Sequence, residues 1–210
     1  QRVLVSISGT IEDEIFKCLR QTQSLVSGIE LNISSPNTAG LRIFHEPARL
    51  RGLIEGLVAE KNVPLFVKLP PWPRDEDTRR ELLNLADTAV DAGVDGLVIA
   101  NTHPIESSRL KVGRGGLSGA PLFEHTELMI ADVQARVQGK AAIIACGGVT
   151  TAEHVWKLLA TGASAVQLYT SFIYEGPGLP SRLNRRLAKL MSVADIDDVA
   201  DIAGPPPAVK

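Results

Sequence analysis

The sequence has no long apolar run, few cysteines and no excess of either charge. No apolar stretch approaches the roughly 18 residues that a membrane-spanning helix requires, and residues 1–9 lack the features of a signal peptide. With 22 Lys and Arg against 24 Asp and Glu, the formal net charge is −2. This charge argues against a basic face that binds nucleic acid, but it allows small neutral or anionic ligands. We expect no membrane crossing and no nucleic-acid partner.

Metal-binding and redox motifs are also lacking. Cys18 and Cys146 are far apart and do not have the spacing of either kind of motif. The histidines have no mutual spacing of a ligand set and no acidic partners at ligand offsets; they are His45, His103, His125 and His154. We therefore expect no metal site, reduced and buried thiols in a reducing compartment, and surface or loop positions for the histidines.

Short β-branched apolar runs alternate with segments of helical spacing. The runs predict strands that are buried on both faces, at Val3–Ile7, Ile29–Ile33, Leu65–Leu69, Gly96–Ala100, Ala142–Ala145 and Ala165–Tyr169. The helical spacing predicts helices at Glu12–Ser24, Pro47–Glu60, Asp75–Ala92, Glu124–Gln138 and Ala152–Ala160. Such alternation indicates parallel strands joined by helical crossovers, and so an α/β fold.

Glycines and polar residues at the strand ends sharpen this prediction. The similar phrases at 91–96 and 160–165 each close a helix with Gly and lead into a strand. Polar residues follow the strands at Ser34–Thr38, Asn101–Thr102, Gly147–Thr150 and Thr170. In a TIM (β/α)8 barrel these positions lie at the catalytic face. Because six units are visible and a barrel needs eight, we interpret them as strands 3 to 8, with the two N-terminal units missing.

The densest polar cluster is Asn32-Ile-Ser-Ser-Pro-Asn-Thr38, directly after an apolar run. Ser, Pro, Asn and Thr are also common turn and capping residues, so the cluster alone does not separate a site from an ordinary strand-loop junction. The wider string from Glu30 to Arg42, Glu-Leu-Asn-Ile-Ser-Ser-Pro-Asn-Thr-Ala-Gly-Leu-Arg, resembles the signature loop of quinone-using dihydroorotate dehydrogenases. The resemblance covers nearly all of the chain from Ile29 to Pro177 and continues more weakly to the end.

The resemblance implies an FMN-dependent barrel that oxidises dihydroorotate to orotate in pyrimidine biosynthesis. It assigns the catalytic base to Ser35, where the soluble classes carry Cys, and substrate-binding amides or hydroxyls to Asn32, Asn37, Asn101 and Thr102. In the implied reaction, Ser35 accepts the C5 proton, hydride leaves C6 for flavin N5, and quinone later reoxidises the flavin.

Lys68 stands at the end of an apolar strand, where an ammonium buried without a partner would cost several kcal/mol. A charged ligand would supply such a partner; the alternative is a lysine that snorkels at the rim of the strand. The resemblance places Lys68, together with Asn32, on the cofactor, near the N1–O2 edge of the flavin. There, an ammonium would stabilise negative charge on the reduced ring.

Three glycine-containing loops, at 115–122, 146–150 and 166–170, follow predicted strands. Loops after the last strands of a barrel often bind phosphate through backbone N–H groups. With the segment 169–177 that follows them, they resemble the FMN-phosphate region of the family. The resemblance therefore adds four cofactor-binding residues: Gly119, Gly148, Tyr169 and Thr170.

Four positions depart from the family pattern. Ala100 replaces a Thr that contacts the flavin, which predicts weaker cofactor binding rather than lost chemistry. His103 replaces a Thr beside the substrate pair and could touch the site. The segment Lys68-Leu-Pro-Pro-Trp-Pro73 lacks the usual Asp, and Ser6 stands where the third strand usually offers Asn.

The resulting domain prediction is a partial FMN-binding barrel over 1–195 and a polar, Pro-rich tail over 196–210. Dihydroorotate, orotate and quinone are the implied partners. Any membrane contact is peripheral, through a missing N-terminal segment, at the cytoplasmic side of a membrane or at the mitochondrial inner membrane. We also expect residues 1–210 alone to aggregate or to bind FMN poorly, since two barrel units are missing.

Two alternatives remain open at this point. One is another flavin barrel that acts on reduced pyrimidines or dihydrouridine, although such enzymes typically carry Cys at the position of Ser35. The other is a barrel fragment that binds phosphorylated ligands without turnover.

Overall fold

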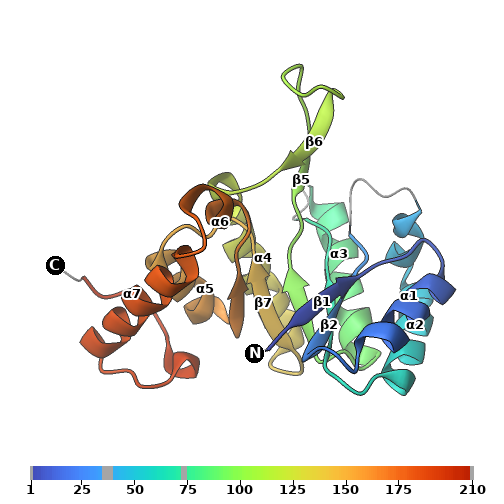
Figure 1. Cartoon of the computed structure of the whole chain (residues 1–210), viewed down its shortest axis with the longest axis horizontal. Coiled ribbons are helices and arrows are strands. Elements are labelled where there is room, and N and C mark those ends of the chain that lie inside the picture. The colour runs from blue at the N-terminus through green and yellow to red at the C-terminus, as the bar shows by residue number, and fades with distance from the viewer. Residues whose placement is uncertain (1, 35–39, 72–74, 209–210) are drawn as a thin grey trace. The chain divides into compact units, whose positions relative to one another are not determined.

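The computed structural model describes residues 2–34, 40–71 and 75–208, which fall into two compact units. Unit 1 comprises Gln1–Asn101 and Ala135–Ala142, and unit 2 comprises Thr102–Gln134 and Ile143–Lys210. Figure 1 shows the ribbon and labels many of the helices and strands of both units.

Unit 1 is built from parallel strands and the helices that connect them. The strands pair in chain order and are β1 (Leu4–Ile7), β2 (Gly28–Asn32), β3 (Leu65–Lys68) and β4 (Gly96–Ile99). The helices are α1 (Glu12–Thr22), the short 3-10 helix η1 (Leu41–His45), α2 (Pro47–Glu60) and α3 (Glu76–Asp91). Helix α2 packs against both α1 and α3 (Figure 1). This is the strand-crossover-strand organisation that the alternating pattern predicts.

The register of these strands separates an apolar face from a polar one. Pairing brings Ser6 opposite Glu30, and Asn32 opposite Lys68. Because alternate residues of a strand point to opposite faces, these four polar residues share one face of the sheet. The residues between them form the apolar face and are fully buried, as Ile29, Leu31, Leu65 and Val67 are.

Helix boundaries in unit 1 follow from capping chemistry. The Glu46 carboxylate accepts hydrogen bonds from the backbone N–H groups of Ala48 and Arg49, at 3.1 and 3.2 Å, and Pro47 opens α2. Asp75 caps α3 through the N–H of Thr78 at 2.9 Å. Beyond the end of α3, Gly93 adopts a φ of 93°, which is costly for any residue with a Cβ atom.

Unit 2 contains the parallel pair β7 (Ala142–Cys146) and β8 (Ala165–Gln167) and an antiparallel ribbon of β5 (His103–Glu106) and β6 (Arg114–Leu117). Its helices are η2 (Ala120–Leu122), α4 (Phe123–Val137), α5 (Ala152–Thr161), α6 (Thr170–Glu175), α7 (Leu179–Val193) and η3 (Val199–Asp201). The first residue of β7 and the last turn of α4 are counted with unit 1. There, the N–H of Ala142 donates to the carbonyl of Asp95, at 3.0 Å. The parallel strands thus follow the order β1-β2-β3-β4-β7-β8.

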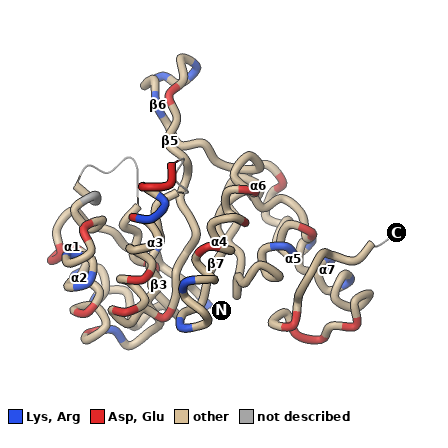
Figure 2. Tube along the Cα trace, turned by 180° about the vertical axis from the view of Figure 1, so that it is seen from behind, with Lys and Arg blue, Asp and Glu red and all other residues tan. Residues whose placement is uncertain are grey.

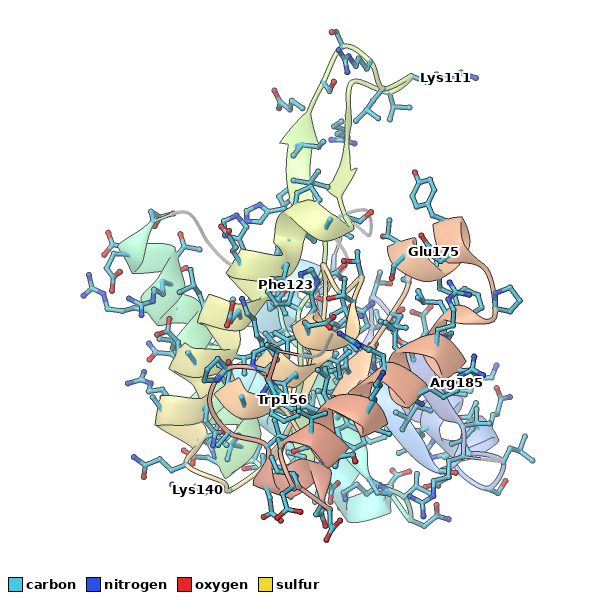
Figure 3. The ribbon with its side chains drawn as sticks, turned by 90° about the vertical axis from the view of Figure 1, so that its left-hand side faces the viewer. Lys111, Phe123, Lys140, Trp156, Glu175 and Arg185 are labelled. Atoms are coloured by element: carbon cyan, nitrogen blue, oxygen red, sulfur yellow. The ribbon has the colours of Figure 1, made fainter. Side chains whose placement is uncertain are left out.

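The core between α5 and α7 is centred on Trp156, which Figure 3 labels. The indole is buried, and its N–H donates to the carbonyl of Gly204 at 3.0 Å. Leu183, Leu190 and Ile202 belong to the same apolar cluster. The segment after α7 is therefore packed against the helices through at least Gly204.

All six predicted strands and all five predicted helices are present, with ends shifted by a few residues at most. The expected burial on both faces is wrong for β1 and β8, which are partly exposed because they are the first and last strands of the sheet order. The ribbon and the helices α6 and α7 are additional elements that the sequence analysis did not predict. The missing N-terminal barrel units stay a prediction. Cys18 lies on α1 and Cys146 in β7; both thiols are reduced and half-buried, whereas full burial was expected.

The expected surface or loop positions of the histidines are partly wrong. His103 begins β5 and is only 8% exposed. His154 lies in α5 and is half-buried, whereas His125 is exposed on α4. Burial of His103 follows from the ribbon pairing, in which it lies opposite Leu117.

Charges of both signs are interspersed along the described parts of the chain, as Figure 2 shows. Ion pairs such as Arg20–Glu60, at 2.7 Å, connect them on the surface of unit 1. Within the ranges that the structure describes, no helix is both long and apolar enough to cross a membrane.

Gly96 provides a test of the packing at the polar face. A Cβ atom there would lie 2.6 Å from the carbonyl oxygen of Ala142 and 2.8 Å from the Phe66 ring. We expect Gly96→Ala to lower the free energy of unfolding by about 1–3 kcal/mol, measured by urea denaturation, because backbone and ring must both move.

Gly52→Ala is the matched control, because Gly52 is exposed in α2 and has nothing within 4 Å of the added methyl. It should raise stability by about 0.5–1 kcal/mol through helix propensity. Equal effects of the two substitutions would contradict the close approach at Gly96.

Candidate functional site

In unit 1, polar side chains from two strand ends are joined by hydrogen bonds. Ser34 donates to the Asn32 Oδ1 through its backbone N–H at 3.1 Å and its hydroxyl at 2.9 Å. Asn101, which follows β4, donates from Nδ2 to Ser34 Oγ at 2.9 Å, although 67 residues separate the two in sequence. The hydrogen bonds fix the rotamers of both predicted substrate-binding asparagines, Asn32 and Asn101. Preorganised amides of this kind suit a ring that carries both N–H and C=O groups.

A second set of polar side chains lies on the same face and includes Glu30, two residues before Asn32 in β2. The Ser6 hydroxyl donates to Glu30 Oε1 at 2.9 Å, and Lys68 Nζ lies 3.8 Å from the same oxygen. The side chains of Glu30 and Lys68 are only 8% and 16% exposed. Because Lys68 is opposite Asn32 in the register, this charged pair adjoins the asparagine network.

The partner of Lys68 revises the sequence-based argument for a ligand. An unpartnered ammonium at this position would have required an anion, but the Glu30 carboxylate already supplies one. Burial of Lys68 alone therefore does not imply a charged ligand. Its position on the polar face, beside Asn32, still agrees with the predicted role.

Two predicted site residues, the base Ser35 and the substrate ligand Asn37, lie outside the described residues. Thr102 is described in unit 2, where its hydroxyl lies against the ribbon. A Cβ atom on Gly116 would be 2.3 Å from Thr102 Oγ1, so the hydroxyl occupies the space that this glycine leaves. The predicted pair Asn101–Thr102 is thus divided between the two units.

In unit 2, two of the predicted phosphate-binding residues are glycines that lie in close contact with a neighbouring segment. A Cβ atom on Gly119 would lie 2.9 Å from Thr170 Cγ2, so these two predicted cofactor ligands are adjacent. Gly148 has a φ of 78°, and a Cβ there would lie 2.2 Å from the backbone N of Phe123. Tyr169, which precedes α6, is 75% exposed. Glycine is required at both loops because backbone and side chains approach within contact distance.

His154 supports the loop that contains Gly148. Its ring stacks on Phe123 with centroids 3.9 Å apart, and its Nδ1 lies 3.2 Å from Thr150 Oγ1. Burial and the positive charge of Lys157 lower the pKa of His154 below its ordinary value of 6.5. The neutral ring is therefore favoured, with Nδ1 as acceptor for the Thr150 N–H at 3.4 Å.

Three contributors were missed at the level of sequence: Glu30, Ser34 and His154. Glu30 stands two residues before Asn32, and that spacing places both on one face of a strand. This signal was present in the sequence. Nothing in the sequence paired Ser34 with Asn101 or His154 with Phe123. As for metals, no group of three or more His, Cys, Asp or Glu that could hold an ion occurs among the residues with described positions.

Comparison with known proteins identifies the family. Residues 1–191 match the family model described as dihydroorotate dehydrogenase. The chain belongs to the dihydroorotate dehydrogenase family. The resemblance of the loop that begins at Glu30 is thereby confirmed over a much longer stretch.

Curated relatives in this family are named dihydroorotate dehydrogenase (quinone). The chain is 36% identical over 189 residues to that of Sphingopyxis alaskensis, covering 86% of this chain and 51% of the relative. It is also 36% identical to that of Rhodococcus erythropolis, over 83% of this chain and 50% of the relative. The chain thus spans about half the length of these relatives.

A solved structure agrees with this family assignment. The crystal structure of DHODH from Eimeria tenella in complex with ferulenol aligns with a TM-score of 0.80 at 32% identity. The alignment covers 92% of this chain and 57% of that one. The α/β fold of the chain is therefore similar to that of a dihydroorotate dehydrogenase.

The environment of His154 predicts a pH dependence of stability in this family member. Because folding lowers the pKa of His154, its contribution is fully present above the ordinary value of 6.5 and is lost as the pH falls below it. We expect the urea concentration at the unfolding midpoint to decrease when the pH is lowered from 7.5 to 5.5. His154→Gln should make this decrease smaller.

His125→Gln, at an exposed histidine of α4, is the control and should leave the pH profile unchanged. A profile for His154→Gln that superimposes on that of the unsubstituted chain would show that this histidine does not stabilise the loop in its neutral form.

Proposed function

We propose that the chain forms part of an FMN-dependent enzyme that oxidises dihydroorotate to orotate in pyrimidine biosynthesis, with quinone as electron acceptor. In this proposal it supplies strands 3 to 8 of a (β/α)8 barrel. The observation that carries the proposal is the hydrogen-bonded set Asn32–Ser34–Asn101, with Lys68 opposite Asn32 in the register. The relatives named dihydroorotate dehydrogenase (quinone) support the choice of substrate and acceptor.

The described residues fit an FMN group at both of its ends. For the phosphate, Gly119 and Thr170 are adjacent, and the backbone at Gly148 lies close to that of Phe123 at the start of α4. For the ring, Lys68 presents an ammonium beside Asn32 on the polar face. Gly119, Gly148, Tyr169 and Thr170 would hold the phosphate end, and Lys68 and Asn32 the ring.

Asn32, Asn37, Asn101 and Thr102 bind the substrate ring in this proposal. An amide side chain can donate and accept at the same time, as the N–H and C=O edges of a pyrimidine require. The hydrogen bonds through Ser34 hold Asn32 and Asn101 before substrate arrives. Because the two amides are already held in place, less entropy is lost on binding, and the ring is fixed for reaction.

Ser35 takes the proton from C5 of the substrate. A serine hydroxyl is a weak base, so it acts only in a closed, dry site with a hydrogen-bonded path for the proton. Held by Lys68 and Asn32 at its ring, FMN would supply the hydride acceptor for C6 and the route for electrons to quinone. A product assay with dihydroorotate and with a reduced pyrimidine separates this function from that of another flavin barrel. Peripheral membrane association, where quinone is available, is part of the same proposal.

The assigned base predicts the effect of Ser35→Ala. In a protein that includes the two N-terminal barrel units, flavin reduction by dihydroorotate should slow by at least about 10²-fold, because the proton acceptor is lost while the flavin site is intact. Stopped-flow absorbance measures this rate, and the flavin-to-protein ratio should stay unchanged.

Ser192→Ala, at an exposed position of α7, is the matched control and should retain the original rate. Reduction of the Ser35→Ala flavin at a rate close to that of the control would rule out Ser35 as the base.

The cationic role of Lys68 predicts a separate effect on the cofactor. Lys68→Ala should weaken FMN retention and make the flavin harder to reduce, since the Glu30 carboxylate is then left without the ammonium. Equilibrium dialysis reports retention, and a reductive titration reports the midpoint potential. A Lys68→Ala variant that retains FMN with an unchanged midpoint potential would show that Lys68 does not lie beside the flavin ring.

A further inference from the structure

Glu30 is a buried carboxylate that has no role in the proposed reaction. It is 6% exposed and points to the same face of the sheet as Asn32, two residues further along β2. A carboxylate in such a position is unfavourable unless charged or hydrogen-bonding groups compensate it. Two such groups are present, the Ser6 hydroxyl at 2.9 Å and the Lys68 ammonium at 3.8 Å.

The pair sets the charge of this face. Along the polar face of β1 to β4, the charged side chains are Glu30 and Lys68, so their formal charges sum to zero. A lone lysine would favour any anion bound beside it. With the carboxylate 3.8 Å from the ammonium, much of that preference is cancelled, because a ligand there is exposed to both charges.

We propose that Glu30 is a specificity-determining residue, which offsets the charge of Lys68 and lowers the preference of the site for an anionic ring over a neutral one. The inference rests on the proposed function, since the ring pair in question is reduced, anionic FMN against oxidised, neutral FMN. Glu30 thus makes the bound flavin a better electron donor than Lys68 alone would allow. Ser6 holds the carboxylate in the orientation that this effect requires.

Glu30→Gln isolates the charge, because glutamine has nearly the same shape and its side-chain oxygen can still accept from Ser6. We expect the ratio of the dissociation constants of oxidised and reduced FMN to rise about tenfold, as loss of one nearby unit charge in a partly buried site implies. A dye-coupled reductive titration at pH 8 measures this ratio through the midpoint potential, without turnover of substrate.

Lys68→Gln and the double variant Glu30→Gln/Lys68→Gln complete the test. The ratio should fall about tenfold in Lys68→Gln and return close to its original value in the double variant, where both charges are gone. If Glu30→Gln alone fails to fold, the ratio of dissociation constants in the double variant, compared with that in Lys68→Gln, still measures the effect of the Glu30 charge. Glu55→Gln, at an exposed glutamate of α2 near Arg51, is the control and should change nothing.

The outcomes separate this inference from the proposed function. The role of Glu30 is overturned if Glu30→Gln retains FMN with an unchanged ratio of dissociation constants. It is also overturned if the double variant has the same ratio as Lys68→Gln. Neither result contradicts the proposed flavin enzyme. All of these measurements use the chain joined to the two N-terminal barrel units of the proposed enzyme. Failure of that unsubstituted protein and of every variant to bind FMN overturns both. A rise with Glu30→Gln that the control does not share supports the inference.

Discussion

The arrangement of the candidate site depends on the register of the parallel strands. Pairing of β1, β2 and β3 places Ser6 opposite Glu30 and Asn32 opposite Lys68, so every polar side chain of these strands that contributes to the site lies on one face. A shift by one residue in β2 would turn Glu30 and Asn32 towards the helices and bring Ile29 and Leu31 to the ligand side. The fully buried apolar residues of β2 and β3 thus keep the polar ones in place. Packing of one face therefore determines the chemistry of the other.

Backbone conformation has the corresponding role in unit 2. Gly119 and Gly148 have φ values of 81° and 78°, and each lies where a Cβ atom would collide with a neighbour. Their loops are shaped by the absence of side chains, while the support comes from larger groups behind them, such as the stacked rings of Phe123 and His154. Unit 1 offers oriented side chains, and unit 2 offers closely packed backbone.

Much of the fold could be predicted because each element has a local cause. Pro47–Glu60 was predicted with its observed bounds, since the capping Glu46 and the Pro that follows it mark the start of the helix. The ribbon was missed because His103-Pro-Ile-Glu106 has little apolar alternation, and its pairing with Arg114–Leu117 depends on contacts across a turn. Helix α7 was missed although Leu183, Leu187 and Leu190 have helical spacing. These residues were counted with the partial barrel over 1–195, but no helix was predicted among them.

The same distinction applies to the site. Asn32, Lys68 and Asn101 were predicted as site residues from the resemblance of the motifs at the ends of apolar runs, which is a local signal, and their roles stay predictions. Ser34 was not, because its importance comes from Asn101, which is 67 residues away. Lys68 was located correctly but its partner was not, since the ion pair with Glu30 requires the register of two strands. Interactions between distant segments are therefore the part that sequence reasoning alone left out.

The hydrogen bond from Trp156 to Gly204 gives the segment after α7 a practical importance. It ties this segment to α5, and Ile202 fills the apolar cluster beside Leu183 and Leu190. Proteolytic trimming upstream of Ile202 would uncover the indole and these leucines together. Since Trp156 is almost completely shielded from solvent, its fluorescence should shift to longer wavelength as soon as water reaches it. In a Trp72→Phe background, where Trp156 is the single tryptophan of the sequence, its emission is therefore an internal reporter of whether the segment after α7 is in place.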